Sequence, residues 1–251
     1  MAAVWYGFPA SSMTIIAVTG TKGKTTTCNM IAGLLGFAGH KTGMMTSINF
    51  QVGERRWSNC LKQSTLPPFM MQRLLKEMKT EGCTHVVVEV TSHAVTQHRV
   101  FGLSPDIAVL TCIDEDHIEY HGSHKAYRDE KLKLFKMLSA GRRKPGVKKV
   151  AILNQDDPYY EEFKDVPCDV TNTYGLKRGT YVATDLELHP TRTEFLLSIP
   201  NDKERIVTKF VGKLNVYNAL AAVGVGLACG MNLRSIKEAL GKAPTVPGRQ
   251  E

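Results

Sequence analysis

A glycine- and lysine-rich segment at residues 19–27 constrains the fold of this chain more than any other feature. It reads Thr-Gly-Thr-Lys-Gly-Lys-Thr-Thr-Thr and lies between an apolar run, residues 14–18, and an apolar-periodic stretch, residues 28–37. The apolar run is typical of a buried strand, and the periodic stretch is typical of a helix. A glycine-rich turn between strand and helix gathers backbone N–H groups and the positive end of the helix dipole at one point. The segment therefore predicts a phosphate-binding loop.

Two side chains at the start of the predicted helix suit a nucleotide and its metal. Lys24 is placed to reach the β- and γ-phosphates, and the Thr25 hydroxyl is placed to bind Mg²⁺. The match is incomplete, because Val18 stands five residues before Gly23, where the usual pattern has glycine. A glycine-rich turn without a ligand is the alternative, but the strand and helix on either side favour a nucleotide. The residues predicted to bind it are Gly20, Thr21, Lys22, Gly23, Lys24, Thr25 and Thr26.

Apolar runs and helical patterns alternate along the first 154 residues. This alternation predicts an α/β fold with a doubly wound, mostly parallel sheet. Right-handed crossovers bring the carboxyl ends of such strands to one edge, where ligands bind. The predicted strands are residues 41–49, 85–90, 107–113 and 150–154, with a hairpin arm at 50–57 and helices at 69–78 and 123–138.

The pattern changes after residue 170. Short alternating segments at residues 181–188, 193–199 and 205–211 predict a small antiparallel β subdomain. Helices are expected at residues 216–229 and 233–240. We expect residues 1–13 to be a leading linker segment and residues 14–251 to form the nucleotide-binding domain.

Composition excludes several classes of protein. No apolar run approaches the length that spans a bilayer, so we expect no membrane partner. Six cysteines without a Cys-x-x-Cys pair indicate reduced thiols and a cytoplasmic location. The net charge of +8 is not arranged as a basic stripe with interleaved aromatic residues, so nucleic acid is not the expected partner. A positive surface also suits a polyanionic small substrate.

Carboxylate and histidine side chains follow the predicted strands. Glu89 ends a valine-rich strand, and a lone charge buried there must be paired or must bind a cation. Magnesium is the interpretation we favour, and a salt bridge to Lys24 or Arg99 is the alternative. The segment 114–124 contains three histidines, but it lacks a zinc-binding pattern. His117 is therefore expected beside the nucleotide magnesium, either as a ligand or in contact with a ligand.

Lys131 falls on an apolar helical face with Tyr127, Phe135 and Leu138. Burial favours the neutral form of an amine, and a neutral amine can add CO₂ to give a carbamate, an anionic oxygen ligand for a second Mg²⁺. The residues alone favour the alternative, in which the lysine extends its ammonium group to solvent.

Taken together, these motifs resemble the central ATPase domain of the Mur ligases, most closely the UDP-N-acetylmuramyl-tripeptide synthetase type. The resemblance covers nearly the whole chain, and the ordered set is more specific than any single motif. Its parts are residues 5–9, 18–27, 64–67, 89–94, 97–100, 116–122, 126–132, 212–219 and 246–249.

The resemblance implies a role for each matching position. Lys24, Lys131 and His117 match catalytic residues of the family, and Lys131 matches its carbamylated lysine, which reverses the interpretation from the residues alone. The magnesium ligands would be Thr25, Glu89, His117 and Lys131. Asn215 and Asn218 match residues near the adenine, and Arg249 matches an arginine near the ATP phosphates. The pocket for the UDP-muramyl-peptide would contain Ser64, Thr65, Thr91, Gln97 and Arg99.

The implied activity is an ATP-dependent ligase of peptidoglycan precursor synthesis, with ATP and Mg²⁺ as cofactors. A UDP-N-acetylmuramyl-peptide and an amino acid would be its substrates. Three positions depart from the family pattern: Lys22 stands for asparagine, Leu66 alters a Ser-Thr-Thr-Pro-like turn, and Thr91 replaces serine. We also expect the family's terminal domains, which hold the uridine and the amino acid, to be absent here or supplied by a partner. The alternatives are a folylpolyglutamate- or cyanophycin-synthetase-like ligase and a nucleotide-binding module without catalysis.

Overall fold

One eleven-stranded sheet organises the computed structural model, which describes residues 1–61, 63–114 and 122–244. The strands follow the order β11-β10-β9-β8-β7-β6-β1-β5-β2-β3-β4. The seven consecutive strands from β9 to β2 pair in parallel, and β1 lies between β5 and β6. The strands are β1 (Thr14–Thr19), β2 (Thr42–Met45), β3 (Asn49–Val52), β4 (Arg55–Ser58), β5 (His85–Glu89), β6 (Ile107–Leu110), β7 (Val150–Asn154), β8 (Val170–Gly175), β9 (Tyr181–Leu188), β10 (Thr193–Ile199) and β11 (Asp202–Thr208).

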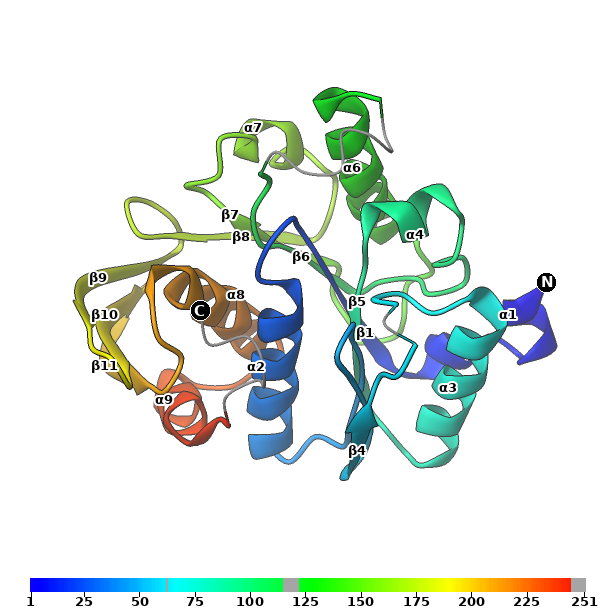
Figure 1. Ribbon diagram of the computed structural model, residues 1–251, viewed down its shortest axis with the longest axis horizontal. Helices are drawn as coiled ribbons and strands as arrows, with labels where there is room; N and C mark the ends of the chain where they lie inside the picture. Colours follow the sequence, from blue (N-terminus) through cyan, green and yellow to red (C-terminus); the bar gives the residue numbers. More distant parts are fainter. Residues whose placement is uncertain (62, 115–121, 245–251) are drawn as a thin grey trace.

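Helices cover both faces of the parallel strands (Figure 1). One face packs against α2 and α8, and the other against α3 and α6. The apolar run of β1 supplies both cores because successive side chains of a strand point to opposite faces. Ile16 and Val18 belong to the first core, and Ile15 and Ala17 to the second. The helices are α1 (Ala2–Trp5), the 3₁₀ helix η1 (Pro9–Ser12), α2 (Lys24–Phe37), α3 (Pro68–Thr80), α4 (Ser92–Thr96), α6 (His124–Ala140), α7 (Tyr160–Phe163), α8 (Lys213–Ala228) and α9 (Leu233–Lys242).

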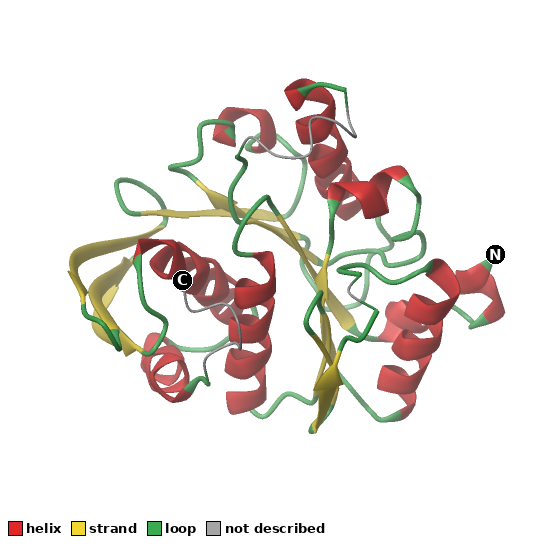
Figure 2. Cartoon of the chain, viewed as in Figure 1, coloured by secondary structure: helices red, strands yellow, loops and turns green. Residues whose placement is uncertain are grey.

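The expected α/β class and mostly parallel sheet are confirmed (Figure 2). The antiparallel strands expected as a separate subdomain instead extend the same sheet, because the short strand pairing between β8 and β9 joins them to it. The third of these strands begins at Asp202, earlier than expected, since Asn201 takes a left-handed conformation with φ of 70° and closes a tight turn between β10 and β11. The sheet therefore continues from the parallel strands into a three-stranded antiparallel edge.

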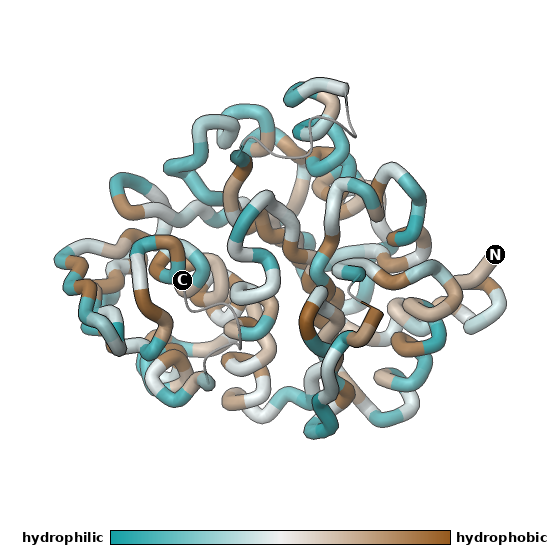
Figure 3. The backbone as a smooth tube through the Cα atoms, in the orientation of Figure 1, coloured by the Kyte–Doolittle hydropathy of each residue, from teal (hydrophilic) through white to brown (hydrophobic). Residues whose placement is uncertain are grey.

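Hydropathy follows this layering. Figure 3 shows apolar residues along the central strands, whereas the outer loops are largely polar. Helices α8 and α9 join the same apolar core as the antiparallel strands. Within the described part of the chain, no helix has both the length and the apolar character that crossing a bilayer requires.

Candidate functional site

The predicted site residues gather at the carboxyl edge of the parallel strands. The phosphate loop follows β1, Glu89 ends β5, and Thr111 follows β6 directly. These three strands are neighbours in the sheet, with β1 in the middle. In open α/β sheets, ligands bind in the crevice outside this edge.

Close packing fixes the shape of the phosphate loop at its glycines. Gly20 has φ of 147°, and a Cβ there would lie 1.9 Å from Thr111 Oγ1. Gly23 has φ of 83°, and a Cβ there would lie 2.1 Å from Asn218 Oδ1. A side chain at either position would clash with atoms that are already in place. The glycines thus let two neighbouring elements approach the backbone of the loop.

Helix α2 begins at Lys24 directly after this loop, and its N-cap residue, Gly23, has no side chain that could cap the first N–H groups. The first N–H groups of a helix have no partners within the helix, so this end suits an anion. Lys24 Nζ donates to Thr21 O at 2.9 Å, which folds the ammonium group over the loop. Lys22 Nζ lies 2.5 Å from Asp114 Oδ2. Two ammonium groups therefore flank the helix N-terminus.

Glu89 meets the start of the same helix. Its side chain is buried, and Oε2 accepts from Thr25 Oγ1 at 2.9 Å and from the Ser47 amide at 3.0 Å. The hydroxyls of Thr25 and Ser47 are 3.0 Å apart. The alternative salt bridge to Lys24 or Arg99 does not form among the described residues, since those cations contact Thr21 O and Thr65 O. A buried carboxylate held by neutral donors beside hydroxyl oxygens has the ligand chemistry that Mg²⁺ prefers.

Ser47 was missed in the sequence, because a serine near the end of a predicted strand carries no distinctive pattern. Thr26, which was predicted, is buried in the first turn of α2. Cys28 is buried one turn further on, and burial, assisted by the charge of Glu89, raises the pKa of its thiol well above the ordinary value. This cysteine is therefore an inert core residue, as expected.

Lys131 points from α6 into the phosphate loop. It is 1% exposed, and its Nζ donates to Gly20 O at 2.8 Å and lies 4.2 Å from the centre of the Tyr127 ring. The Tyr127 hydroxyl in turn lies 3.0 Å from Thr21 Oγ1. The alternative in which Lys131 extends to solvent is therefore wrong, and the amine lies beside the loop.

The residues predicted for the UDP-muramyl-peptide surround the end of β5. Thr65 Oγ1 donates to Glu89 O at 3.0 Å, and the Thr91 amide contacts that hydroxyl at 3.3 Å. Arg99 Nη1 donates to Thr65 O at 3.1 Å. The other two predicted residues are the half-buried Ser64, one position before Thr65, and the exposed Gln97, at the end of α4. Thr65 thus links Thr91 and Arg99 to the backbone of Glu89.

Asn215 and Asn218 lie in the first turns of α8, and both are buried. Asn218 Nδ2 donates to Asn215 Oδ1 at 3.0 Å, and Asn218 Oδ1 accepts from Thr27 Oγ1 at 3.2 Å. Asn218 also lines a cavity of about 410 Å³ beside the phosphate loop. The lining residues are Lys22, Thr111, Cys112, Ile113, Asp114, Asn154, Asp156, Asp157, Pro158, Leu214, Tyr217 and Asn218.

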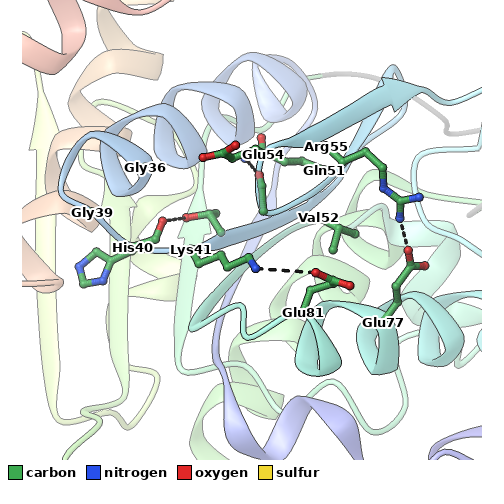
Figure 4. A pocket seen from close by; sticks show the side chains of 12 residues that line it. Gly36, Gly39, His40, Lys41, Gln51, Val52, Glu54, Arg55, Glu77 and Glu81 are labelled. Carbon is green, nitrogen blue, oxygen red and sulfur yellow. Dashed lines mark hydrogen bonds and ion pairs between the residues drawn. The ribbon is translucent and has the colours of Figure 1, made fainter.

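A larger cavity, of about 950 Å³, includes none of the predicted site residues in its lining. It lies by the hairpin of β3 and β4, the end of α2 and the outer part of α3 (Figure 4). Lys41 lies 3.7 Å from Glu81, and Arg55 pairs with Glu77. This cavity therefore lies apart from the predicted site at the phosphate loop.

Two predicted residues, His117 and Arg249, lie outside the described residues. Among the described residues, one group has the spacing of a metal site: Glu187, His189 and Glu194. Arg205 pairs with Glu187 and Glu194, and Arg192 also pairs with Glu194. This group lies on β9 and β10 and their connection, and it is not the predicted magnesium site.

The fold and the loop together define a nucleotide-binding α/β domain with a phosphate loop after its central strand. Comparison with known proteins narrows this class: the Mur ligase middle domain matches residues 18–226. The chain belongs to the Mur ligase family.

Relatives cover the chain completely. It is 39% identical over 254 residues to a UDP-N-acetylmuramoyl-L-alanyl-D-glutamate–2,6-diaminopimelate ligase of Geobacillus thermodenitrificans. This match covers 100% of this chain and 51% of that ligase. A solved ligase of the same name superposes with a TM-score of 0.81 at 28% identity, covering 94% of this chain and 47% of its own. The chain spans about half the length of the curated relatives it matches.

A more distant structure shares the fold. Folylpolyglutamate synthase of Mycobacterium tuberculosis, complexed with ADP and AMPPCP, has a TM-score of 0.76 at 18% identity. That match covers 100% of this chain and 63% of the synthase. At this identity the likeness establishes the arrangement of the chain alone.

Proposed function

We propose that this chain is the ATP-binding core of a ligase that joins an amino acid to a UDP-N-acetylmuramyl-peptide in peptidoglycan precursor synthesis. The observation that carries the proposal is the convergence of Glu89, Thr25 and Lys131 on one phosphate loop. A simple nucleotide-binding turn needs no buried lysine and no buried carboxylate at this point. The relatives that cover the whole chain are named as ligases of this substrate class. We place the reaction in the cytoplasm.

The proposed reaction has two steps. A carboxylate oxygen of the UDP-muramyl-peptide attacks the γ-phosphorus of ATP, and the bond to the bridging oxygen breaks, giving an acyl phosphate and ADP. The amine of the amino acid then attacks the acyl carbon, loses a proton and expels inorganic phosphate. The reaction thus forms one amide bond for each ATP that is split.

The protein's contribution to the first step is charge and position. The N-terminus of α2 and the ammonium group of Lys24 would hold the phosphates and offset negative charge on the transferred group. Thr25 and Glu89 would hold Mg²⁺, together with His117 and a carbamylated Lys131. Bound Mg²⁺ supplies Lewis-acid stabilisation of the phosphoryl oxygens. Arg249 would approach the same phosphates.

The remaining predicted residues would bind the adenine of ATP and the UDP-muramyl-peptide. Asn215 and Asn218 would lie near the adenine. Ser64, Thr65, Thr91, Gln97 and Arg99 would bind the UDP-muramyl-peptide, with the guanidinium of Arg99 facing its negative charge. The bond from Thr65 to the backbone of Glu89, and the bond from Arg99 to Thr65, would bring this substrate next to the γ-phosphate. Uridine and amino-acid binding would need parts beyond residues 1–251, in this protein or in a partner.

Phosphate release measured with the whole 251-residue chain tests the proposal. Addition of UDP-muramyl-dipeptide in the presence of Mg-ATP should raise the rate, whereas a folate or a peptide polymer should not. Calorimetry should show Mg-ATP binding that is lost in Lys24→Ala and kept in Lys76→Ala, an exposed lysine on α3. Absence of ATP binding would remove the nucleotide function altogether, and stimulation by folate would favour the folylpolyglutamate alternative. Binding without stimulation by any acceptor would favour a non-catalytic module.

A further inference from the structure

A mostly apolar pocket lies near the amino ends of β1 and β6, whereas the phosphate loop follows the carboxyl end of β1. Its volume is about 440 Å³, and it is formed by η1 with the residue before it, the segment between α4 and β6, and the carboxyl end of α6. Its lining includes the apolar residues Phe8, Phe101, Met137 and Ala140 and the cationic residues Arg142 and Lys144. Small-molecule sites of this size are lined mainly by apolar groups, with a few polar groups that orient the ligand. The proposed ligase chemistry uses none of these residues.

Two aromatic side chains line this pocket although water reaches much of their surface. Phe101 is 64% exposed and Phe8 is 44% exposed. The backbone around Phe8 is fixed, since its amide donates to Ala3 O at 2.8 Å and its carbonyl accepts from the Ser11 amide at 3.0 Å. Exposed aromatic surface that is already held in place can pack against the apolar part of a ligand at little cost in ordering.

The same pocket contains positive charge that the described residues do not balance. Arg142 is exposed and forms no ion pair or hydrogen bond with another described residue. Lys144 is buried, and its Nζ donates to Met13 O at 2.7 Å and pairs with Asp106 Oδ2. Lys149 Nζ lies 3.1 Å from the other oxygen of Asp106. Two ammonium groups therefore share one buried carboxylate, and one positive charge is in excess.

A second anion would suit both cations of the lining. Burial lowers the pKa of Lys144, and the charge of Lys149 adds to this shift, although Asp106 opposes it. A further negative charge beside Lys144 would stabilise its ammonium form. The planar guanidinium of Arg142 can bind a carboxylate through two parallel hydrogen bonds. A phosphate dianion would carry more charge into an apolar pocket, so its desolvation would cost more than that of a carboxylate.

We propose that this pocket binds a small amphipathic carboxylate. The carboxylate pairs with Arg142 near Lys144, and the apolar part packs against Phe8, Phe101 and Met137. An uncharged ligand would leave the excess positive charge unbalanced, and a small anion without an apolar part would leave the aromatic rings in water. The pocket shares no lining residue with the nucleotide site, so this inference does not rest on the proposed function.

Calorimetry on the whole 251-residue chain with eight-carbon probes tests the charge requirement. Octanoate should bind at least about 10-fold more tightly than octanol or octyltrimethylammonium, because only the carboxylate forms charge-assisted hydrogen bonds with the lining. In Arg142→Gln the preference for octanoate over octanol should fall to within about 3-fold. The matched control is Arg143→Gln, which changes the next arginine. Arg143 pairs with Asp169 and does not line the pocket, so this variant should keep the preference.

Ala140→Phe tests whether the probes bind in this pocket. Ala140 is exposed and lines it, so a phenyl ring at this position should fill the space and abolish binding of octanoate and octanol. Urea unfolding should be the same as for the unaltered chain, which distinguishes a filled pocket from a folding defect. As a second variant, Phe101→Ala removes an exposed ring and should weaken both probes by the same factor. Phe69→Ala, at an exposed residue of α3, should leave both affinities unchanged.

Four results would overturn the inference and leave the proposed function standing. Equal affinity for octanoate and octanol would remove the role of Arg142 and Lys144. Tighter binding of octyl phosphate than of octanoate would exclude a carboxylate as the preferred group. Unchanged octanoate binding in Ala140→Phe would place the probe elsewhere on the chain. Absence of octanoate binding, together with a dimer in sedimentation that Phe101→Ala dissociates, would assign the aromatic surface to a second copy of the chain.

Discussion

Glu89 carries its negative charge at the end of a strand that is buried on both faces, and its described contacts are neutral donors. Two hydrogen bonds offset part of the cost of burial, and a divalent cation would offset the rest. Thr25 contributes to this arrangement twice, since its hydroxyl donates to Glu89 now and would be a metal ligand when a nucleotide is bound. The single residue pair thus links the start of α2 to the end of β5.

Glu89→Gln should separate metal-assisted binding from binding of the bare nucleotide. The amide keeps the shape of the side chain but removes the charge that would hold Mg²⁺. We expect ATP affinity measured by calorimetry to fall at least about 10-fold in Mg²⁺, and to change little with excess EDTA. The control is Glu54→Gln, an exposed residue of the hairpin turn. An equal loss with and without metal would contradict a magnesium role.

Lys131→Ala tests whether the buried amine acts as a carbamate. Its removal should abolish phosphate release, and added short-chain carboxylates should restore part of the activity, because they can supply the missing anionic oxygen. Lys133→Ala on the same helix, which removes an exposed lysine paired with Glu130, should need no rescue. Inactivity that acetate or formate cannot relieve would instead indicate that the bond from Lys131 to Gly20 O holds the loop.

At the scale of elements, the phosphate loop depends on neighbours that are distant in the sequence. Thr111 approaches Gly20 and Asn218 approaches Gly23, so β6 and α8 help to shape a loop that belongs to β1 and α2. The sequence showed that glycine is required but not which atoms require it. The same limit applies to Lys131, which extends from α6 to the backbone of the phosphate loop.

Gly23→Ala and Gly33→Ala make a matched pair on and near α2. At Gly23 a methyl group would meet Asn218 Oδ1 and strain a positive φ, so we expect about 1–3 kcal/mol of lost stability together with weaker ATP binding. At Gly33 nothing lies within 4 Å, and alanine should stabilise the helix by up to about 1 kcal/mol. Denaturant unfolding gives both values. Unimpaired stability and ATP binding in Gly23→Ala would show that the loop can rearrange freely.

Strands with a continuous apolar run were predicted well, and β7 (Val150–Asn154) has the expected bounds. Strand β8 was missed because its sequence, Val-Thr-Asn-Thr-Tyr-Gly, is largely polar and its burial is confined to the last three residues. It forms because it pairs in parallel with β7. Local pattern therefore identified the strands that supply the core, but not β8, which pairs in parallel with both β7 and β9.

At the scale of the molecule, the parallel strands run from an edge that contains a pair of histidines to the edge that contains the phosphate loop. At the second edge β5 begins with His85, whose ring centre is 4.2 Å from that of His40 and whose Nδ1 lies 2.9 Å from Thr84 Oγ1. Burial, and secondarily His40, lower the pKa of His85 to about 4. Protonation of this residue is therefore coupled to the stability of the whole fold.

The sign of that coupling follows from the two pKa values. The unfolded chain binds the proton near pH 6.5 and the folded chain only near pH 4, so the contribution of His85 is complete above 6.5 and is lost as the pH falls toward 4. Because the ring is partly exposed, we expect a loss of about 1–2 kcal/mol, below the roughly 3 kcal/mol of the full shift. Urea unfolding at pH 7 and 4.5 should show this loss relative to His85→Gln, whereas His98→Asn, at an exposed residue, should follow the unaltered chain. The free energy of unfolding could instead fall equally with pH in the unaltered chain and in His85→Gln. His85 would then bind protons alike in the folded and unfolded chains, and another group would cause the loss of stability at low pH.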